Sequence, residues 1–551
     1  MRTKLFFAAA CLLLLTFVGP TFVIAQTMEQ QVDAYLKARY PANKPGVSFL
    51  IAKDGKTIYR KAFGMANLEL HVPMKPENVF EIGSITKQFT AVSILMLEEQ
   101  GKLAVHDEIT KFIPDYPTKG KKITIHQLLN HTSGIKSYTN MESFISLART
   151  DMTPKQLIDV FKNEPMDFEP GEQYAYNNSG YILLGYIIEI ASGKSYADFI
   201  QHNIFDKIGM TASSYGSKSK LVPNRASGYS ESDKGYINAE YLSLTLPYAA
   251  GSIMSTTNDL LKWQNALNSY KLIKKSSYEK AIHGSKLNNG SPITYGYGLA
   301  TENVNGSPSI QHGGGIFGYT TMGIYLPEQK IFVSGLQNCD CNSISAIATA
   351  VAAIAIGKPF PDKKNAIKLS EVELKKWIGA YQFDGNVFRN ISLENGQLYS
   401  AKDGGTKSQL YPMSKTHFIF DGGSTSYQFA EKDGKKQAAF TVNGNTVIGV
   451  ESVKQVPVEK ASITLSPEIL STYVGKYELA PGILMEISTK DSQLFTQLPG
   501  QPKFEIFAEK EDHFYLKVVV AQLVFKKDNA GKITSVTLFQ NGREMPAKKV
   551  E

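Results

Sequence analysis

A serine and a lysine three positions apart, Ser84 and Lys87, are the residues whose spacing most directly suggests catalysis. They open a stretch of helical periodicity at residues 88–100, and positions i and i+3 of a helix share one face, with Cβ atoms about 5–6 Å apart. Gly83 lets the chain enter the helix tightly and lets a substrate approach the backbone. A serine is a weak nucleophile until a neighbouring base removes its proton. Ser-x-x-Lys is a common pattern, so it needs support from other segments.

Two further motifs follow in a fixed order. Tyr176 and Asn178 form a Tyr-x-Asn loop just before a predicted helix at residues 181–191, and His312 precedes three glycines ahead of the last strands of the domain. The order Ser-x-x-Lys, Tyr-x-Asn, His-x-Gly, spaced by 92 and 136 residues, resembles the class C β-lactamase-like serine hydrolases. That group includes D-alanyl-D-alanine carboxypeptidases, penicillin-binding peptidases, D-aminopeptidases and esterases. The resemblance covers roughly residues 30–358 and includes the stretches 123–134 and 250–256.

The resemblance implies an acyl-enzyme on Ser84, with Tyr176 as principal base and leaving-group acid and with Lys87 lowering its pKa. Unperturbed tyrosine and lysine have pKa values near 10 and 10.4, so at pH 7 roughly one in a thousand of either is deprotonated. Recovering that fraction takes a shift of about three units, or about 4 kcal/mol. The two groups should titrate as a coupled pair, so the residues alone do not decide which is the base.

The same resemblance assigns the binding groups. Asn178 would bind the acyl-side amide of the substrate and hold the lysine, and the backbone N–H groups of Ser84 and Gly315 would form an oxyanion hole. Gly314, within the glycine run, would let the strand edge approach the substrate. Each residue also has a plain structural alternative: Tyr176 as a packing aromatic, Asn178 as a helix N-cap, and His312 as a surface histidine.

His312 stands where β-lactamases of this fold usually have lysine. A histidine with a pKa near 6.5 is mostly neutral at pH 7 and attracts a substrate carboxylate weakly. This favours a peptidase or an esterase over an efficient β-lactamase. If His312 does bind a carboxylate, kcat/KM should be bell-shaped in pH, with its optimum drawn toward the histidine pKa.

Several other chemistries are excluded or unsupported by the sequence. It contains no Gly-x-Ser-x-Gly elbow and no His-Glu-x-x-His motif, so neither an ordinary α/β-hydrolase nor a metalloprotease is indicated, and we expect no metal and no cofactor. Cys11 is expected to leave with the N-terminal segment, and the two remaining cysteines do not make a zinc site. Cys339 and Cys341 would point to opposite faces of a strand, which predicts no disulfide. The net charge of +8 without a dense basic run indicates no nucleic-acid partner.

The N-terminal segment, residues 1–25, resembles a secretory signal. Arg2 and Lys4 precede an apolar run, and the small residue Ala25 stands before Gln26 as the expected cleavage position. We therefore expect an exported protein, periplasmic or secreted, with no stable membrane span after cleavage. The alternative is a signal that is retained as an anchor. The apolar run at residues 346–356 is too short for a bilayer span and predicts a buried helix.

The 551 residues divide into unlike parts. The hydrolase domain at 26–358 mixes strand and helix periods, which predicts an α+β (α/β) sandwich with an antiparallel sheet and a helical subdomain. A linker rich in proline and charge at 359–369 follows. Residues 370–455 and 466–551 then repeat one pattern at an offset of 96 residues, with alternating strands and Asn-Gly or Asp-Gly turns. They predict two small all-β barrels, which resemble the lipocalin-like domains appended to some exported serine hydrolases.

The functional prediction is an exported serine hydrolase of the D-alanyl-D-alanine carboxypeptidase or D-peptidase type, or a carboxylesterase. Its substrate would be a small molecule, peptide or ester, with cell-wall peptides among the candidates. The alternatives are a β-lactamase, and a non-catalytic penicillin-binding scaffold that uses its C-terminal repeats for binding. The sequence does not indicate an oligomeric state.

Overall fold

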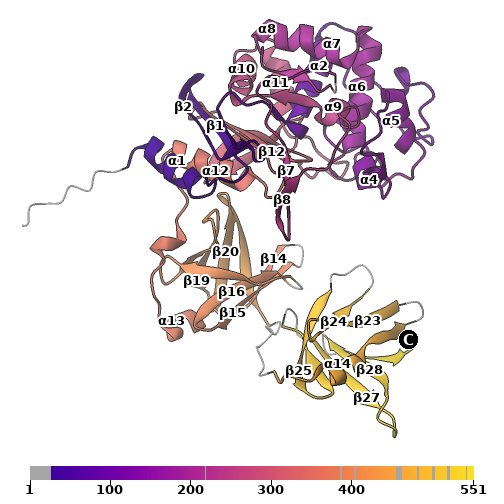
Figure 1. Ribbon diagram of the computed structural model, residues 1–551, viewed down its shortest axis with the longest axis vertical. Helices are drawn as coiled ribbons and strands as arrows, with labels where there is room; N and C mark the ends of the chain where they lie inside the picture. Colours follow the sequence, from indigo (N-terminus) through magenta and orange to yellow (C-terminus); the bar gives the residue numbers. More distant parts are fainter. Residues whose placement is uncertain are drawn as a thin grey trace, which may run out of the picture.

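The computed structural model describes residues 26–551 except 218, 385–386, 403–404, 454–461, 481–482, 499–502, 518–520 and 541–542. The predicted signal segment, residues 1–25, lies outside the described residues. Figure 1 shows three bodies in chain order, with the first barrel between the mixed domain and the second barrel. None of the helices within the described ranges is long and apolar enough to cross a membrane.

The first domain is built on a six-stranded antiparallel sheet in the order β10-β11-β12-β13-β1-β2. Its strands are β1 (Val47–Lys53), β2 (Lys56–Phe63), β10 (Ala300–Val304), β11 (Ser307–Ile316), β12 (Tyr319–Leu326) and β13 (Ile331–Gln337). Every residue of β13 is buried, because helices cover both faces of the sheet at this strand. A strand enclosed in this way reads as a continuous apolar run rather than an alternating one.

Two helical layers enclose the sheet. On one face, α1 (Met28–Lys37) packs on α12 (Ser345–Ala355), which is the predicted apolar helix, and Val351 and Ala352 are fully buried there. On the other face, α10 (Thr257–Asn268) contacts β1 and β13, and Trp263 stacks on Phe89 of α2 (Thr86–Glu99) with ring centroids 4.0 Å apart. Almost the whole of α2 is buried because it also packs on α6 (Asn178–Ser192) and α9 (Tyr248–Gly251).

The remaining elements of this domain are short. The helices are α3 (Ile125–Leu129), α4 (Phe144–Leu147), α5 (Pro154–Phe161), α7 (Tyr196–Ile200), α8 (Asp206–Ile208) and α11 (Lys275–Ile282). The strands are β3 (Met65–Asn67), β4 (Val72–Pro73), β5 (Phe80–Glu81), β6 (Ser214–Tyr215), β7 (Tyr229–Ser232), β8 (Gly235–Asn238) and β9 (Ile253–Ser255). The predicted α+β class with a helical subdomain is confirmed.

Two closed antiparallel barrels of eight strands each follow, as predicted. Helix α13 (Glu371–Lys375) precedes the first, and α14 (Pro467–Tyr473) precedes the second. The first barrel has β14 (Gly379–Phe383), β15 (Val387–Glu394), β16 (Gln397–Lys402), β17 (Ser408–Pro412), β18 (His417–Ile419), β19 (Thr425–Lys432), β20 (Lys435–Val442) and β21 (Asn445–Ser452). The second has β22 (Gly475–Ala480), β23 (Ile483–Lys490), β24 (Gln493–Gln497), β25 (Phe504–Lys510), β26 (His513–Tyr515), β27 (Ala521–Lys527), β28 (Ile533–Gln540) and β29 (Arg543–Lys549).

Equivalent aromatic residues fill both barrels. Trp377 lies against Phe429 with ring centroids 5.2 Å apart, and its counterpart 96 residues later, Tyr473, lies 4.7 Å from Phe525. These four side chains are at most 2% exposed. Aromatic side chains therefore fill the interior of both barrels at this position, as side chains do in small barrels.

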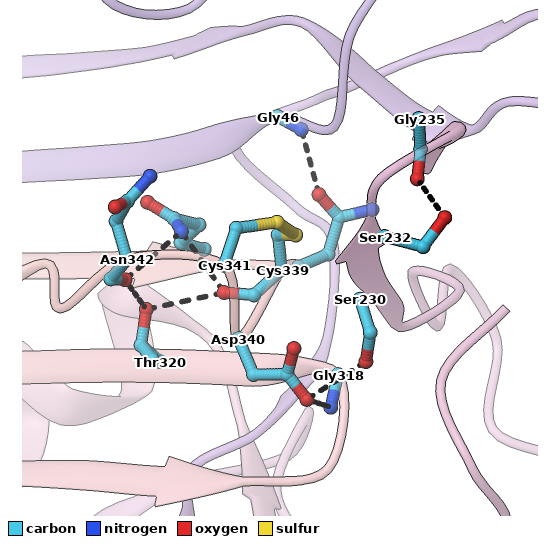
Figure 2. Close-up of a disulfide and its surroundings, with 12 residues drawn as sticks. Gly46, Ser230, Ser232, Gly235, Gly318, Thr320, Cys339, Asp340, Cys341 and Asn342 are labelled. Atoms are coloured by element: carbon cyan, nitrogen blue, oxygen red, sulfur yellow. Dashed lines mark hydrogen bonds between the residues drawn. A yellow bond between two sulfur atoms is a disulfide. The ribbon is translucent and has the colours of Figure 1, made fainter. Parts of the chain in front are cut away.

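The prediction of no disulfide is wrong. Cys339 and Cys341 are bonded, with Cα atoms 5.3 Å apart (Figure 2). The alternation of strand side chains does not apply to them, because β13 ends at Gln337 and the chain bends through residues 338–342. The bend presents Asp340, whose Oδ2 accepts hydrogen bonds from the Gly318 N–H at 2.8 Å and the Ser230 hydroxyl at 3.0 Å. The disulfide thus sits in a bend that anchors the turn between β11 and β12.

Candidate active site

Ser84 lies in the tight turn η1 (Gly83–Ile85) that leads into α2, and the glycines of β11 press against this turn. Gly83 has a φ of +51°, a conformation that side-chain-bearing residues adopt rarely, and a Cβ there would lie 3.0 Å from the backbone of Gly315. A Cβ on Gly314 would lie 2.0 Å from the Ile82 carbonyl oxygen. The glycines are therefore required by the close contact between the serine turn and the strand, independently of any contact with a substrate.

Lys87 is fully buried beneath the serine. Its Nζ lies 2.8 Å from Oδ1 of Asn178, 2.9 Å from the carbonyl oxygen of Ala250 and 3.1 Å from Oγ of Ser84. Burial holds the pKa of the amine well below its ordinary value, since a charged group loses its hydration there. A neutral amine can donate one N–H to each carbonyl oxygen and direct its lone pair at the Ser84 hydroxyl.

Tyr176 approaches the same serine from the loop before α6. Its ring centroid lies 4.8 Å from the Lys87 Nζ, and its phenol shares a hydrogen bond with Ser84. Burial of the phenol raises its pKa above the ordinary value, and the Ser84 bond only partly opposes this. The residue is still 38% exposed, so a substrate can reach it. The raised pKa keeps the Tyr176 phenol protonated at neutral pH, so it can donate a proton. The pKa of Lys87, in contrast, is shifted from its ordinary value toward neutral pH, so this amine can accept one.

Asn178 is available to the site because the residue before it caps the helix. Oδ1 of Asn177 accepts from the Gly180 N–H at 2.8 Å, which is the N-cap contact of α6. Asn178 is the first residue of the helix, and besides accepting from Lys87 its Nδ2 donates to Oγ1 of Thr139 at 3.0 Å. The structure thus places Asn178 where it holds the lysine, and the capping alternative belongs to Asn177.

His312 is buried in β11 rather than lying on the surface, and it is only 6% exposed. Its Nδ1 lies 2.6 Å from the Gly313 carbonyl oxygen, and its Nε2 lies 2.7 Å from the Tyr295 hydroxyl. A carbonyl only accepts, so the proton is on Nδ1 and Nε2 accepts from the tyrosine. Burial lowers the pKa of His312 to about 4. If protonation of His312 affects kcat/KM, the acid limb of that pH profile therefore lies near pH 4, below the pH expected from an ordinary histidine.

Three buried residues complete the site that sequence reasoning did not identify individually. His131 is 1% exposed, its ring centroid lies 4.4 Å from that of Tyr176, and its Nδ1 accepts from the Asn177 N–H at 3.0 Å. Ala250 supplies the carbonyl oxygen that binds Lys87. Both lie in stretches that already resemble the family, so a signal existed. Tyr295, which holds His312, has no motif around it and could be found only from the fold.

Two cavities lie at the candidate site. One, of about 440 Å³, is lined by Ser84, Asn178 and Gly315 together with apolar side chains such as Phe144 and Phe317. The other, of about 400 Å³, is lined by residues that include Tyr176 and His312. The first cavity includes Ser84 itself, and the second is lined by Tyr176, whose phenol shares a hydrogen bond with Ser84. Among the residues that the structure describes, no cluster of three or more His, Cys, Asp or Glu side chains is arranged to hold a metal ion.

Comparison with family models gives two matches. Residues 24–354 match the family described as Beta-lactamase, and residues 459–549 match a "Domain of unknown function (DUF3471)". The first match includes every residue of the site described above. The second coincides with the second barrel.

Curated relatives and solved structures agree with the first match. Penicillin-binding protein 4* of Bacillus subtilis (strain 168) is 32% identical over 412 residues, which are 69% of this chain and 89% of that protein. The D-aminopeptidase of Gluconobacter oxydans (strain 621H) is 24% identical over 348 residues, which are 61% of this chain and 63% of that enzyme, so the match spans less than two thirds of its length.

Among solved structures, the octameric penicillin-binding protein homologue from Pyrococcus abyssi has a TM-score of 0.55 at 29% identity and covers 77% of this chain and 99% of its own. The D-stereospecific amidohydrolase from Streptomyces sp. has a TM-score of 0.53 at 26% identity, with coverage of 60% and 99%.

Proposed function

The chain belongs to the beta-lactamase family of serine hydrolases, and from this premise we propose that it is an exported amidohydrolase that cleaves D-peptides or D-amino acid amides through an acyl-enzyme on Ser84. The observation that carries the proposal is the buried Lys87 amine, which two carbonyl oxygens hold against the Ser84 hydroxyl. Burying an ammonium costs free energy, so we would not expect a lysine with only a structural role to be fully buried beside a serine.

The proposed acylation starts with proton transfer from Ser84 to the neutral Lys87 as Oγ attacks the scissile carbonyl carbon. The backbone N–H groups of Ser84 and Gly315 would stabilise the resulting oxyanion, an effect that can be worth about 3–4 kcal/mol per donor. Tyr176 would give its phenolic proton to the leaving nitrogen, and the C–N bond would break. The proton on Lys87 would then pass to the Tyr176 phenolate, whose ring centroid lies 4.8 Å from Nζ, and both groups would regain their starting protonation states.

In deacylation, water would be the nucleophile and Ser84 the leaving group. The Lys87–Tyr176 pair would take a proton from a water molecule that attacks the ester carbonyl, and Ser84 would recover its proton as the product acid leaves. This division of labour makes Lys87 the proton acceptor for acylation. It therefore exchanges the roles that the family resemblance suggested for Lys87 and Tyr176, and it follows from the opposite directions of their pKa shifts.

The choice of D-configured amides is supported by the names of the relatives, a D-aminopeptidase and a D-stereospecific amidohydrolase. The neutral His312 also supports a choice other than an efficient β-lactamase. Export is supported by the signal-like segment at residues 1–25. The likeness to a penicillin-binding protein suggests that penicillin can also acylate Ser84.

The test compares D- and L-alanine p-nitroanilide, p-nitrophenyl acetate and a chromogenic cephalosporin with the purified full chain and its Ser84→Ala variant. We expect turnover of the D-anilide above the L-anilide and, after separate incubation with benzylpenicillin, a penicilloyl adduct on Ser84 by mass spectrometry. Ser84→Ala should lose at least about a thousandfold in rate and all of the adduct. A chain that neither turns over any substrate nor forms the adduct would instead be the non-catalytic scaffold.

A further inference from the structure

The cavity of about 400 Å³ on the Tyr176 side of the serine is closed by a different domain. Its inner wall is formed by Tyr176, Tyr295 and His312 of the first domain, and its outer wall includes Ser424, Val442 and Asn443 of the first barrel. Ser424 lies just before β19, and Val442 and Asn443 lie at the turn between β20 and β21. The Asn443 N–H donates to the Ser424 carbonyl oxygen at 2.8 Å, which joins the two barrel segments into one surface.

This outer wall is fixed to the first domain by contacts between turns. A Cβ on Gly444 would lie 2.0 Å from the backbone nitrogen of Gly306, so the β20–β21 turn and the β10–β11 turn touch through their backbones. Beside them, Nδ2 of Asn303 donates to Oδ1 of Asn445 at 2.6 Å. The barrel segment just before Ser424 is held as well, since a Cβ on Gly423 would lie 2.0 Å from the Pro361 carbonyl oxygen of the linker.

The position of the cavity identifies the part of a substrate that it would hold. Tyr176 lines it, and Tyr176 is the group that protonates the leaving nitrogen in the mechanism above. The acyl half of the substrate would lie in the other cavity, with Asn178 and Gly315. The cavity at the barrel therefore adjoins the leaving group.

The only charged side chain in the described lining of this cavity is acidic. Glu302 is exposed and supplies a carboxylate to the lining, and no lysine or arginine lines this cavity in the parts of the chain that the structure describes. Its one histidine, His312, is neutral, with its Nδ1–H directed to the Gly313 carbonyl oxygen and its Nε2 occupied by Tyr295. A leaving group with a free carboxylate would find no cationic partner in this lining and would be repelled by Glu302.

We propose that the first barrel completes the leaving-group subsite of Ser84, and that this subsite selects uncharged or cationic leaving groups over leaving groups that carry a free carboxylate. The inference rests on the proposed function and narrows it. It makes the enzyme an amidase or aminopeptidase acting on amidated or amine-bearing leaving groups, rather than a carboxypeptidase that releases a free C-terminal D-amino acid.

The test uses two substrates that differ only in that charge, D-alanyl-D-alanine and D-alanyl-D-alanine amide, and measures the ratio of their kcat/KM values in the full chain. We expect the amide to be preferred at least about threefold at low ionic strength, the size of an exposed charge interaction. Ser424→Lys on the barrel and Glu302→Gln on the first domain should each shift the ratio toward the acid by about two- to fivefold. Ser408→Lys, an exposed position on β17 outside the cavity lining, should leave the ratio unchanged.

The outcomes separate the two proposals. Preference for the acid in the natural chain, or a ratio that Ser424→Lys does not move while its thermal unfolding matches that of Ser408→Lys, would overturn the subsite. If Glu302→Gln shifts the ratio of kcat/KM values and Ser424→Lys does not, the first barrel is not part of the subsite. Failure to hydrolyse either dipeptide, together with the absence of an acyl-enzyme on Ser84, would overturn the proposed function itself.

Discussion

The Nζ atom of Lys87 lies 3.1 Å from Oγ of Ser84, and its two other contacts, at 2.8 and 2.9 Å, are both carbonyl oxygens. A neutral amine fits this arrangement with two N–H donors and one lone pair, and an ammonium would fit it with three donors. The lowered pKa of the buried amine is what favours the neutral form. The following predictions depend on this arrangement and on the buried groups around it.

The first prediction concerns the pH dependence of acylation. Because the proposed mechanism uses the neutral amine of Lys87 and its pKa is lowered, kcat/KM for p-nitrophenyl acetate should rise with pH through a midpoint below the ordinary lysine value of about 10.5. Lys87→Met should lose about 10²–10⁴ in rate and the limb with it. The measurement is a pH–rate profile from pH 5 to 10. A limb that persists in Lys87→Met would assign it to another group.

The second prediction separates the roles of acid and base. Tyr176→Phe should slow hydrolysis of an amide by roughly a hundredfold or more, because the amine must be protonated to leave. It should slow a p-nitrophenyl ester by less than about tenfold, because p-nitrophenolate leaves without help. The rising limb of the ester profile should remain. Equal losses on both substrates would make Tyr176 the base for acylation, as the family resemblance suggested.

The third prediction concerns stability in acid. The pKa of His312 is about 4 in the folded chain and about 6.5 in the unfolded chain. The unfolded state binds more protons between these values, so the free energy of unfolding should fall as pH drops from 6.5 to 4, by up to about 3 kcal/mol from this group. Burial also lowers the pKa of His126 to about 4 and that of His131 well below its usual range, so they act in the same direction.

Urea unfolding at pH 7 and pH 4.5 measures this effect. The chain has two tryptophans, Trp263 in the first domain and Trp377 in the first barrel, so a Trp377→Phe background lets Trp263 report the first domain alone. In that background His312→Asn should reduce the pH dependence. Replacing His71, an exposed histidine of the same domain outside the site, serves as the matched control. An identical slope in both variants would contradict the assignment.

The fourth prediction concerns the Cys339–Cys341 disulfide. The bond closes a loop of only three residues, so the loop-entropy relation gives a loss of only about 1–2 kcal/mol on reduction. Unfolding of the first domain should therefore shift slightly in a reducing agent, and the Cys339→Ser/Cys341→Ser double variant should be insensitive to it. A shift of several kcal/mol would show that the bend around Asp340 depends on the bond for more than loop closure.

Local sequence determined much of the framework. The alternation around Asp54-Gly55, the capping box of Ser370 and Glu373, and the offset of 96 residues each act over short distances or by simple repetition. The resulting elements match the structure within a few residues. The order of Ser84, Tyr176 and His312 also predicted three side chains that the fold brings together, and their catalytic roles remain part of the proposal.

Properties that depend on contacts between distant segments were decided only by the tertiary structure. The protonation of Lys87 depends on burial by α6 and α9, and the neutrality of His312 depends on burial and on Tyr295, which no sequence pattern marks. The disulfide depends on where β13 ends, and the barrel wall depends on the contact of two turns about 140 residues apart, at Gly306 and Gly444. Residue types and spacing specify which groups are available, whereas their pKa values and the shape of the subsite arise from desolvation and packing that exist only once the chain has folded.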